Sequence, residues 1–74
     1  MARQHTAWVI QNGKGDDAEY VHFRSGGSVL FTGLRLATQF SRRSDARCVL
    51  DYLKGRYPKM YDERAFRPVE KQFG

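Results

Sequence analysis

Few residues in this sequence are of the types that catalyse reactions or bind metals. The only cysteine, Cys48, and the two histidines, His5 and His22, lie at unrelated spacings. Nucleophilic catalysis needs a serine or cysteine beside a base and an orienting group, and a structural zinc site needs about four ligands. Neither pattern is present in the sequence, so we expect no enzyme activity, no metal and no cofactor. We interpret Cys48 as a half-buried structural thiol at the border of a helical apolar stripe.

One acidic group precedes the second predicted strand. Asp16, Asp17 and Glu19 lack the alternating ligands and the terminal bidentate glutamate of a calcium loop. We interpret this segment as a solvated loop, and the alternative is a contact surface for a basic partner.

Arginines form the more informative group. The chain has 13 Lys+Arg against 8 Asp+Glu, a net charge of +5. Arg42, Arg43 and Arg47 cluster at the start of the predicted main helix, with Arg35 shortly upstream. A cation there is unfavourable by about 0.3–1 kcal/mol at an exposed site, whereas guanidinium groups beside free backbone N–H groups would bind an anion. The alternative is a solvated helix face in which Arg47 pairs with Asp51 at i, i+4.

Tyr61 is the aromatic residue that we expect to be exposed, because it lies in a segment, 59–64, that is predicted to be a polar connection. Tyrosine and arginine are enriched at protein interfaces, and both stack on single-stranded bases. The candidate partner-binding residues are therefore Arg35, Arg42, Arg43, Arg47 and Tyr61.

Short runs of strand-forming residues predict the strands that must position these groups, and the run over 20–24 also alternates, with Val21 and Phe23 on one face. The runs are rich in β-branched and aromatic residues and end at glycine-containing turns, at 6–11, 20–24 and 29–32. A last extended segment covers 65–70, and because Pro68 cannot donate to a ladder, this strand should lie on an edge or pair only partly. The tail, 71–74, is expected to be frayed.

A one-sided apolar stripe predicts the main helix over 44–54. Its members fall at i, i+3, i+4, i+7 and i+11: Ala46, Val49, Leu50, Leu53 and Tyr57. Ser41 and Ser44 are the candidate N-caps, and Gly55 followed by Pro58 should end the helix. A shorter helical turn is expected within 34–40, with its apolar side against the sheet.

These elements predict a single α+β domain over residues 1–74. A small antiparallel sheet of three or four strands is packed by one amphipathic helix, since short loops between successive strands favour a meander. The predicted core is Trp8, Ile10, Val21, Phe23, Val29, Phe31, Phe40, Ala46, Val49, Leu50 and Leu53.

The order of elements resembles small phage and prophage accessory proteins of β-β-β-α-β type. The matching pieces are Trp8-Val9-Ile10, Ala37-Thr38-Gln39-Phe40, Ser44-Asp45-Ala46 and Phe66-Arg67-Pro68-Val69. The resemblance implies an origin in a mobile element, and a subset of such proteins are anti-CRISPRs or other inhibitors of host defence. The type has no catalytic motif to carry over.

The leading functional hypothesis is a non-enzymatic binding protein that inhibits a larger host protein or ribonucleoprotein complex by occupying one of its working surfaces. Two mechanisms fit a target that handles nucleic acid: an acidic surface of this chain could cover the basic guide or DNA contacts of the target, or the arginines could bind acidic patches on the target. The net charge of +5 favours the second. The alternative is direct nucleic-acid binding, with the arginines on phosphates and Tyr61 or His22 as a stacking surface. A lone cysteine and the lack of an 18-residue apolar run lead us to expect a cytoplasmic protein with no membrane partner.

Overall fold

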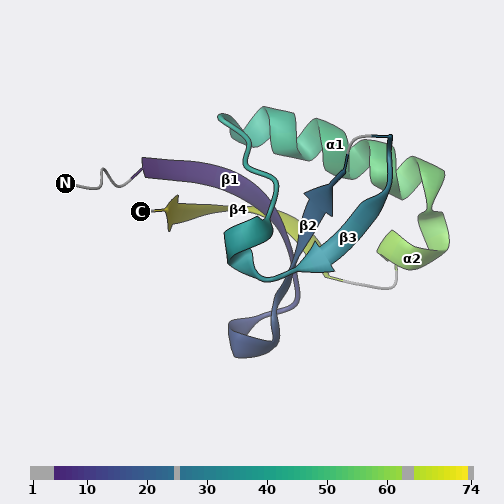
Figure 1. Cartoon of the computed structure of the whole chain (residues 1–74). Helices are drawn as coiled ribbons and strands as arrows, with labels where there is room; N and C mark the ends of the chain where they lie inside the picture. Colours follow the sequence, from purple (N-terminus) through teal and green to yellow (C-terminus); the bar gives the residue numbers. More distant parts are fainter. Residues whose placement is uncertain (1–4, 25, 63–64, 74) are drawn as a thin grey trace.

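The computed structural model describes residues 5–24, 26–62 and 65–73, which form a four-stranded antiparallel sheet with one main helix (Figure 1). The predicted small α+β fold is therefore confirmed. The elements in chain order are β1 (His5–Asn12), η1 (Gly15–Asp17), β2 (Glu19–Phe23), β3 (Val29–Thr32), η2 (Leu34–Leu36), α1 (Arg43–Arg56), α2 (Pro58–Asp62) and β4 (Phe66–Phe73).

The strand order in the sheet is β3-β2-β1-β4, so β3 and β4 are the two edges. β4 pairs with β1 along its whole length, from His5↔Phe73 to Asn12↔Phe66. β2 and β3 pair over the full length of β3. The central strands β1 and β2 share only two pairs, Gln11↔Tyr20 and Asn12↔Glu19, so they diverge beyond that point.

The chain that follows η2 connects the diverging strands β1 and β2. The Phe40 N–H donates to Trp8 O and the Trp8 N–H donates to Phe40 O, each at 2.8 Å. On the other side, the Thr38 N–H donates to Val21 O at 3.0 Å and Thr38 Oγ1 accepts from Phe23 N at 2.8 Å. These bonds hold 38–40 in extended backbone, so the helical turn expected within 34–40 is limited to η2.

The main core lies between the sheet and α1. Ala46, Leu50 and Leu53 of α1 are buried against one face of the sheet, as the helical stripe predicted. Every residue of the predicted core belongs to this cluster, either buried or packed against it. Tyr61 and Phe66 complete it, and their rings lie 4.5 Å apart.

A second, smaller cluster covers the opposite face of the sheet. Val9, Tyr20 and Ala37 are buried there, and Leu34 of η2 packs against them together with Val69 of β4. The sheet is therefore covered on both faces, by α1 on one and by the η2 segment on the other. The His22 ring also holds this segment, with Nδ1 2.6 Å from Leu36 O.

The predicted ends of the main helix were wrong at both termini. Arg42 is the N-cap and makes no side-chain capping bond, so neither Ser41 nor Ser44 caps α1. The helix continues through Gly55, which does not have the positive φ of a left-handed stop, and it ends at Arg56. Burial of Leu53 against the sheet keeps the last turn in place, which outweighs the cost of about 1 kcal/mol for a helical glycine.

Two further segments differ from the sequence prediction. The expected polar connection begins with a short helix, α2, for which Pro58 supplies a first residue whose fixed φ suits a helix start. Of the tail predicted to fray, 71–73 instead continue β4, because Lys71, Gln72 and Phe73 pair with the start of β1, and Gly74 lies outside the described residues. The His5 ring stacks on Phe73 with centroids 5.6 Å apart. β4 does lie on an edge of the sheet, as Pro68 predicted.

Candidate binding surfaces

Arg42, Arg43 and Arg47 project from the first turns of α1 and form what we call the arginine end. All three side chains are exposed. Arg42 Nε lies 3.9 Å from Asp45 Oδ2, and Arg47 Nε lies 3.5 Å from Asp51 Oδ1. The i, i+4 pair of the solvated-face alternative is thus present, although exposed pairs of this kind contribute only about 0.3–0.5 kcal/mol.

Arg43 makes no ion pair with any residue that the structure describes. The first turn of α1 also lacks a side-chain cap, so its free N–H groups are left to solvent or to a ligand. Guanidinium groups and free N–H groups both attract carboxylate or phosphate. The arginine end therefore has the chemistry of an anion-binding surface.

The remaining predicted site residues do not join this cluster. Arg35 is exposed on η2, which covers the opposite face of the sheet from α1. The prediction that Tyr61 is exposed was wrong, because its side chain is only 1% exposed. α2 turns the ring into the core, where it contacts Phe66 and lies 6.5 Å from Phe31.

Cys48 and His22 also differ from their sequence interpretations. Cys48 is exposed rather than half-buried, because it lies two residues from both Ala46 and Leu50 and so points away from the buried stripe. His22 is half-buried, and its ring is hydrogen bonded to the backbone of η2 rather than facing solvent. Within residues 5–24, 26–62 and 65–73, no three His, Cys, Asp or Glu side chains are grouped as metal ligands.

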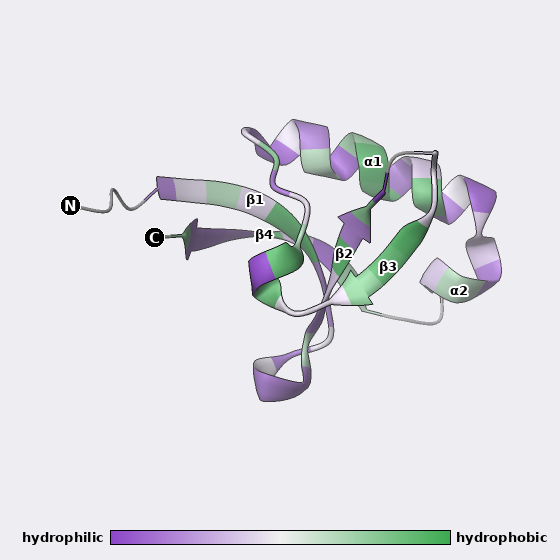
Figure 2. Cartoon of the chain, in the orientation of Figure 1, coloured by the Kyte–Doolittle hydropathy of each residue, from purple (hydrophilic) through white to green (hydrophobic). Residues whose placement is uncertain are grey.

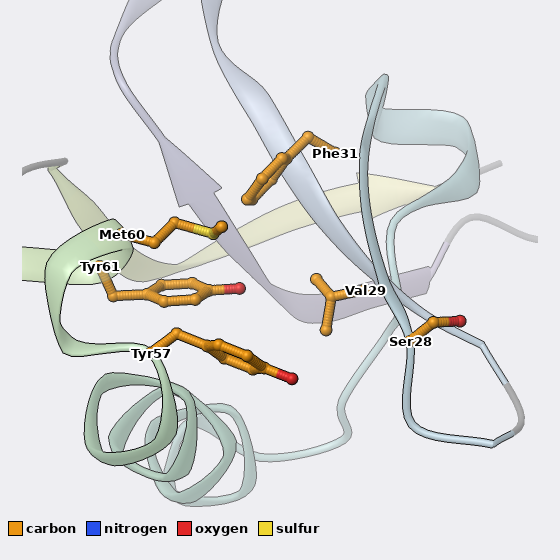
Figure 3. Close-up of a pocket in the computed structure, with 6 residues that line it drawn as sticks. All are labelled: Ser28, Val29, Phe31, Tyr57, Met60 and Tyr61. Atoms are coloured by element: carbon orange, nitrogen blue, oxygen red, sulfur yellow. The ribbon is translucent and has the colours of Figure 1, made fainter.

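A second candidate surface lies beyond the other end of α1, between β3 and α2. It is a hollow of about 300 Å³ lined by Ser28, Val29, Phe31, Tyr57, Met60 and Tyr61, which we call the β3 groove. Figure 3 shows Val29 and Phe31 projecting from β3 toward the rings and the Met60 thioether on the helical side. Met60 is 45% exposed and Tyr57 is 39% exposed. The described lining of this groove is therefore largely apolar, and it includes two partly exposed side chains, Tyr57 and Met60.

The described side chains at the rim of the β3 groove carry positive charge. Lys59 lines an adjoining hollow together with Tyr57, Pro58 and Met60. Arg56 lies over the Tyr57 ring, 5.7 Å from its centroid, and its Nε donates to Tyr57 Oη at 3.3 Å. This hydrogen bond, followed by the charges of the Tyr52 and Tyr57 phenol groups, raises the pKa of Arg56 above its usual value. An arginine is not deprotonated in proteins, so Arg56 keeps its positive charge beside the groove.

Sequence reasoning missed the β3 groove. The available signal was Tyr57-Pro58-Lys59-Met60, two large apolar residues around a proline where a polar connection was expected. Another hollow, of about 730 Å³, lies beside η2, and its lining is four consecutive residues, 33–36. It includes Leu36, which is 65% exposed. Because a single short segment lines it, this hollow is a concave surface rather than an enclosed pocket.

Compared with protein-family models, with curated proteins and with solved structures, the chain has no significant match in any of the three. Among the described residues, no helix is long and apolar enough to cross a membrane.

Proposed function

We propose that this chain is a non-enzymatic binding protein of a phage or other mobile element, which inhibits a larger host complex in the manner of an anti-CRISPR. It would do so by occupying a working surface of that complex. The observation that carries the proposal is the arginine end: three exposed guanidinium groups at a helix start where cations are unfavourable. A helix selected for stability alone would carry acids there, as Asp45 does.

The chemistry of this surface indicates an acidic partner. Arginine binds carboxylates and phosphates in bidentate geometry and is enriched at protein hot spots. Arg43 is available for such a contact because no described residue pairs with it, and the pairs of Arg42 and Arg47 are exposed and weak. An acidic protein surface could displace both pairs at little cost.

The test reverses the charge of the arginine end. In the variant Arg43→Glu/Arg47→Glu, the new acids lie near the helix start, where the dipole favours them, although Arg47→Glu places a like charge at i, i+4 from Asp51. We expect the free energy of unfolding to stay within about 1 kcal/mol of the parent. Binding to a partner captured from bacterial lysate should weaken at least about tenfold, or ~1.4 kcal/mol.

Two results would contradict the proposal. Unchanged binding with unchanged stability would mean that the cluster is only a solvated helix face. A large loss of stability would mean that the arginines are packed into the fold. The control matched for charge compares two single variants, Arg43→Glu and Arg35→Glu, because Arg35 is an exposed arginine on the other face of the sheet.

Direct nucleic-acid binding is the second candidate function, and one observation counts against it. Tyr61 and His22, the two expected stacking residues, are buried and half-buried respectively. The arginines alone would contact phosphates, and affinity would then fall steeply with salt because each neutralised phosphate releases counterions. A gel shift at low salt with mixed-sequence DNA and RNA tests this candidate, and absence of binding at tens of micromolar protein would dismiss it.

A further inference from the structure

The corner where α1 ends and α2 begins is rich in exposed aromatic and cationic side chains. Of the five large apolar side chains that are exposed in the described part of the chain, three lie here: Tyr52, which is 59% exposed, Tyr57 and Met60. Arg56 and Lys59 are exposed beside them, and we call these five residues the α1–α2 corner. Aromatic residues, methionine and arginine are enriched at protein interfaces, so an exposed cluster of them is a candidate binding surface.

Contacts between the side chains join the corner into one surface. Arg56 lies over the Tyr57 ring, and its Nε donates to Tyr57 Oη at 3.3 Å. This hydrogen bond and the phenol group of Tyr52, one helical turn earlier, raise the pKa of Arg56. An arginine has five N–H donors, and the bond to Tyr57 uses one of them. The guanidinium is therefore restricted before a partner arrives, which lowers the entropy lost on binding.

A hollow of about 330 Å³ lies beside these rings, lined by Tyr57, Pro58, Lys59 and Met60. Neither Phe31 nor Tyr61 belongs to this lining, so the hollow is distinct from the β3 groove. Its walls are a phenol ring, a proline ring, a thioether and the carbon stem of a lysine. An aliphatic or aromatic side chain placed there would cover parts of Tyr57 and Met60 that are now exposed.

The charge of the corner determines the chemistry of its partner. Residues 52–61 contain three basic residues and no acid. The acid that precedes them, Asp51, lies 3.5 Å from Arg47 in an ion pair one turn back along α1. A partner that covers the corner therefore needs anionic groups, because a cation there would be repelled.

An acidic protein segment fits the corner better than two other anionic occupants. A single strand of nucleic acid is bound through a row of cations that follows its backbone, whereas the corner supplies two cations beside an apolar hollow. A second copy of the chain would offer its exposed acids, Asp16, Asp17 and Glu19. The large side chain next to them, Tyr20, is buried, so this acidic group has no apolar residue to place in the hollow.

We propose that the α1–α2 corner binds an acidic segment of a partner protein in which a large apolar side chain lies beside carboxylates. The apolar side chain would enter the hollow beside Tyr57 and Met60, and a carboxylate would accept hydrogen bonds from the Arg56 guanidinium. Partner and tyrosine rings together would exclude water from this ion pair and strengthen it. The corner is at the opposite end of α1 from the arginine end, and the proposal does not depend on that surface (Figure 1).

The probes are two short fluorescein-labelled peptides flanked by Gly and Ser. One carries Asp-Glu followed by Leu-Phe, and the other carries the same residues in reverse order. Anisotropy titrations of the full chain should show saturable binding of at least one peptide. Replacement of Leu-Phe by Gly-Gly, or of Asp-Glu by Asn-Gln, should each weaken binding at least about tenfold. In amide NMR spectra, the largest shifts should fall within 52–60.

Several results would overturn the proposal. Absence of binding by both peptides would remove the site. Full binding by the Gly-Gly peptide, or shifts confined to Arg43 and Arg47, would mean charge attraction without use of the hollow. Tighter binding of oligo-dT or oligo-U than of either peptide would identify a nucleic acid as the occupant. A dimer in sedimentation that Arg56→Met dissociates would identify a second copy.

A double-mutant cycle tests the contact between guanidinium and carboxylate. Arg56→Met removes the charge and keeps an apolar stem, and Arg35→Met is the matched control at an exposed arginine on the other face of the sheet. Arg56→Met should weaken binding of the acidic peptide at least about tenfold and that of the Asn-Gln peptide less than about threefold, since the latter has no carboxylate to lose. Arg35→Met should change neither. Equal losses for the two peptides would overturn the proposed contact.

Two further variants test the apolar half of the surface. Met60→Thr should weaken binding at least about tenfold, while the control Leu36→Thr removes an even more exposed side chain from η2 and should leave binding unchanged. Tyr52→Ala keeps the test decisive if Met60→Thr fails to fold, because Tyr52 is exposed on a helix, where alanine is favourable. It should also weaken binding at least about tenfold. Unchanged binding in the folded variants would overturn the proposal.

Discussion

The two edge strands of the sheet, β3 and β4, differ in the residue types that control association with a further strand. β4 carries Arg67, Glu70 and Lys71 with a proline between them, whereas β3 is apolar. Figure 2 shows the difference directly, with β3 green and most of the visible part of β4 purple. β4 thus carries charges and a proline, the features that protect an edge against a further strand, whereas the sequence of β3 contains neither.

The position of Pro68 strengthens this contrast. Trp8 exchanges both backbone bonds with Phe40, so it directs these groups away from β4, and its neighbours Ala7 and Val9 bond to β4 instead. Ile10↔Pro68 is then a pair without ladder bonds, and the missing N–H of Pro68 would have faced outward. Pro68 therefore removes a hydrogen-bond donor from the outer side of β4 without removing a hydrogen bond between β1 and β4.

The largest expected effect concerns the start of β4, where the closing edge is anchored in the core. Phe66 is 8% exposed, and its ring packs on Tyr61 and Phe31. Phe66→Ala should lower the free energy of unfolding by about 3–5 kcal/mol, because a large cavity replaces the ring. Urea unfolding followed by circular dichroism measures the loss. Leu36→Ala, at a 65% exposed site, is the control and should stay within about 0.5 kcal/mol.

An intermediate effect separates the two sets of backbone groups in β3. The Arg24 N–H donates to Ser28 O, so the next bonded pair is His22↔Leu30, and the backbone groups of Val29 face away from β2. Leu30→Pro removes an N–H that bonds to His22 and leaves its acceptor unpaired, at a cost of about 1–3 kcal/mol beyond that of Val29→Pro. Side-chain burial predicts the opposite order, since Leu30 is 42% exposed and Val29 is half-buried. Urea unfolding of both variants decides between the two orders, and equal losses would mean that the outward groups of β3 were assigned wrongly.

Local patterns in the sequence were sufficient to predict most of the strands and the main helix. The strands predicted over 20–24 and 29–32 and the helical stripe through Ala46, Leu50 and Leu53 depend on neighbours along the chain, and the structure confirms them in β2, β3 and α1. The burial of Tyr61 and the helical conformation of Gly55 could not be predicted from local patterns. Contacts with distant segments decide that Tyr61 is buried and that the helix passes through Gly55.

The two candidate surfaces differ in the same way: local sequence patterns predict the first and not the second. Exposure of the arginines follows from their place on the polar side of a helical pattern, so it was predictable. The β3 groove depends on strand order: β3 is an edge only because β4 returns to the far side of β1. That return joins residues 54 to 68 positions apart, from Asn12 and Phe66 to His5 and Phe73, and no short motif encodes it. A surface that depends on topology becomes visible only with the structure.

The smallest expected effect tests the protected edge. Pro68→Val adds an N–H that faces outward from β4, so it neither gains nor loses a ladder bond, and its β-branched side chain suits a strand. We expect the free energy of unfolding to change by less than about 1 kcal/mol. The new amide should exchange rapidly with solvent in hydrogen-exchange NMR, in contrast to the Val69 amide, which bonds to β1 and should be protected. Protection of the amide at position 68 would show that the ladder between β1 and β4 has the opposite pattern. The charged side chains on either side should still prevent association through β4, because they protect this edge independently of the proline.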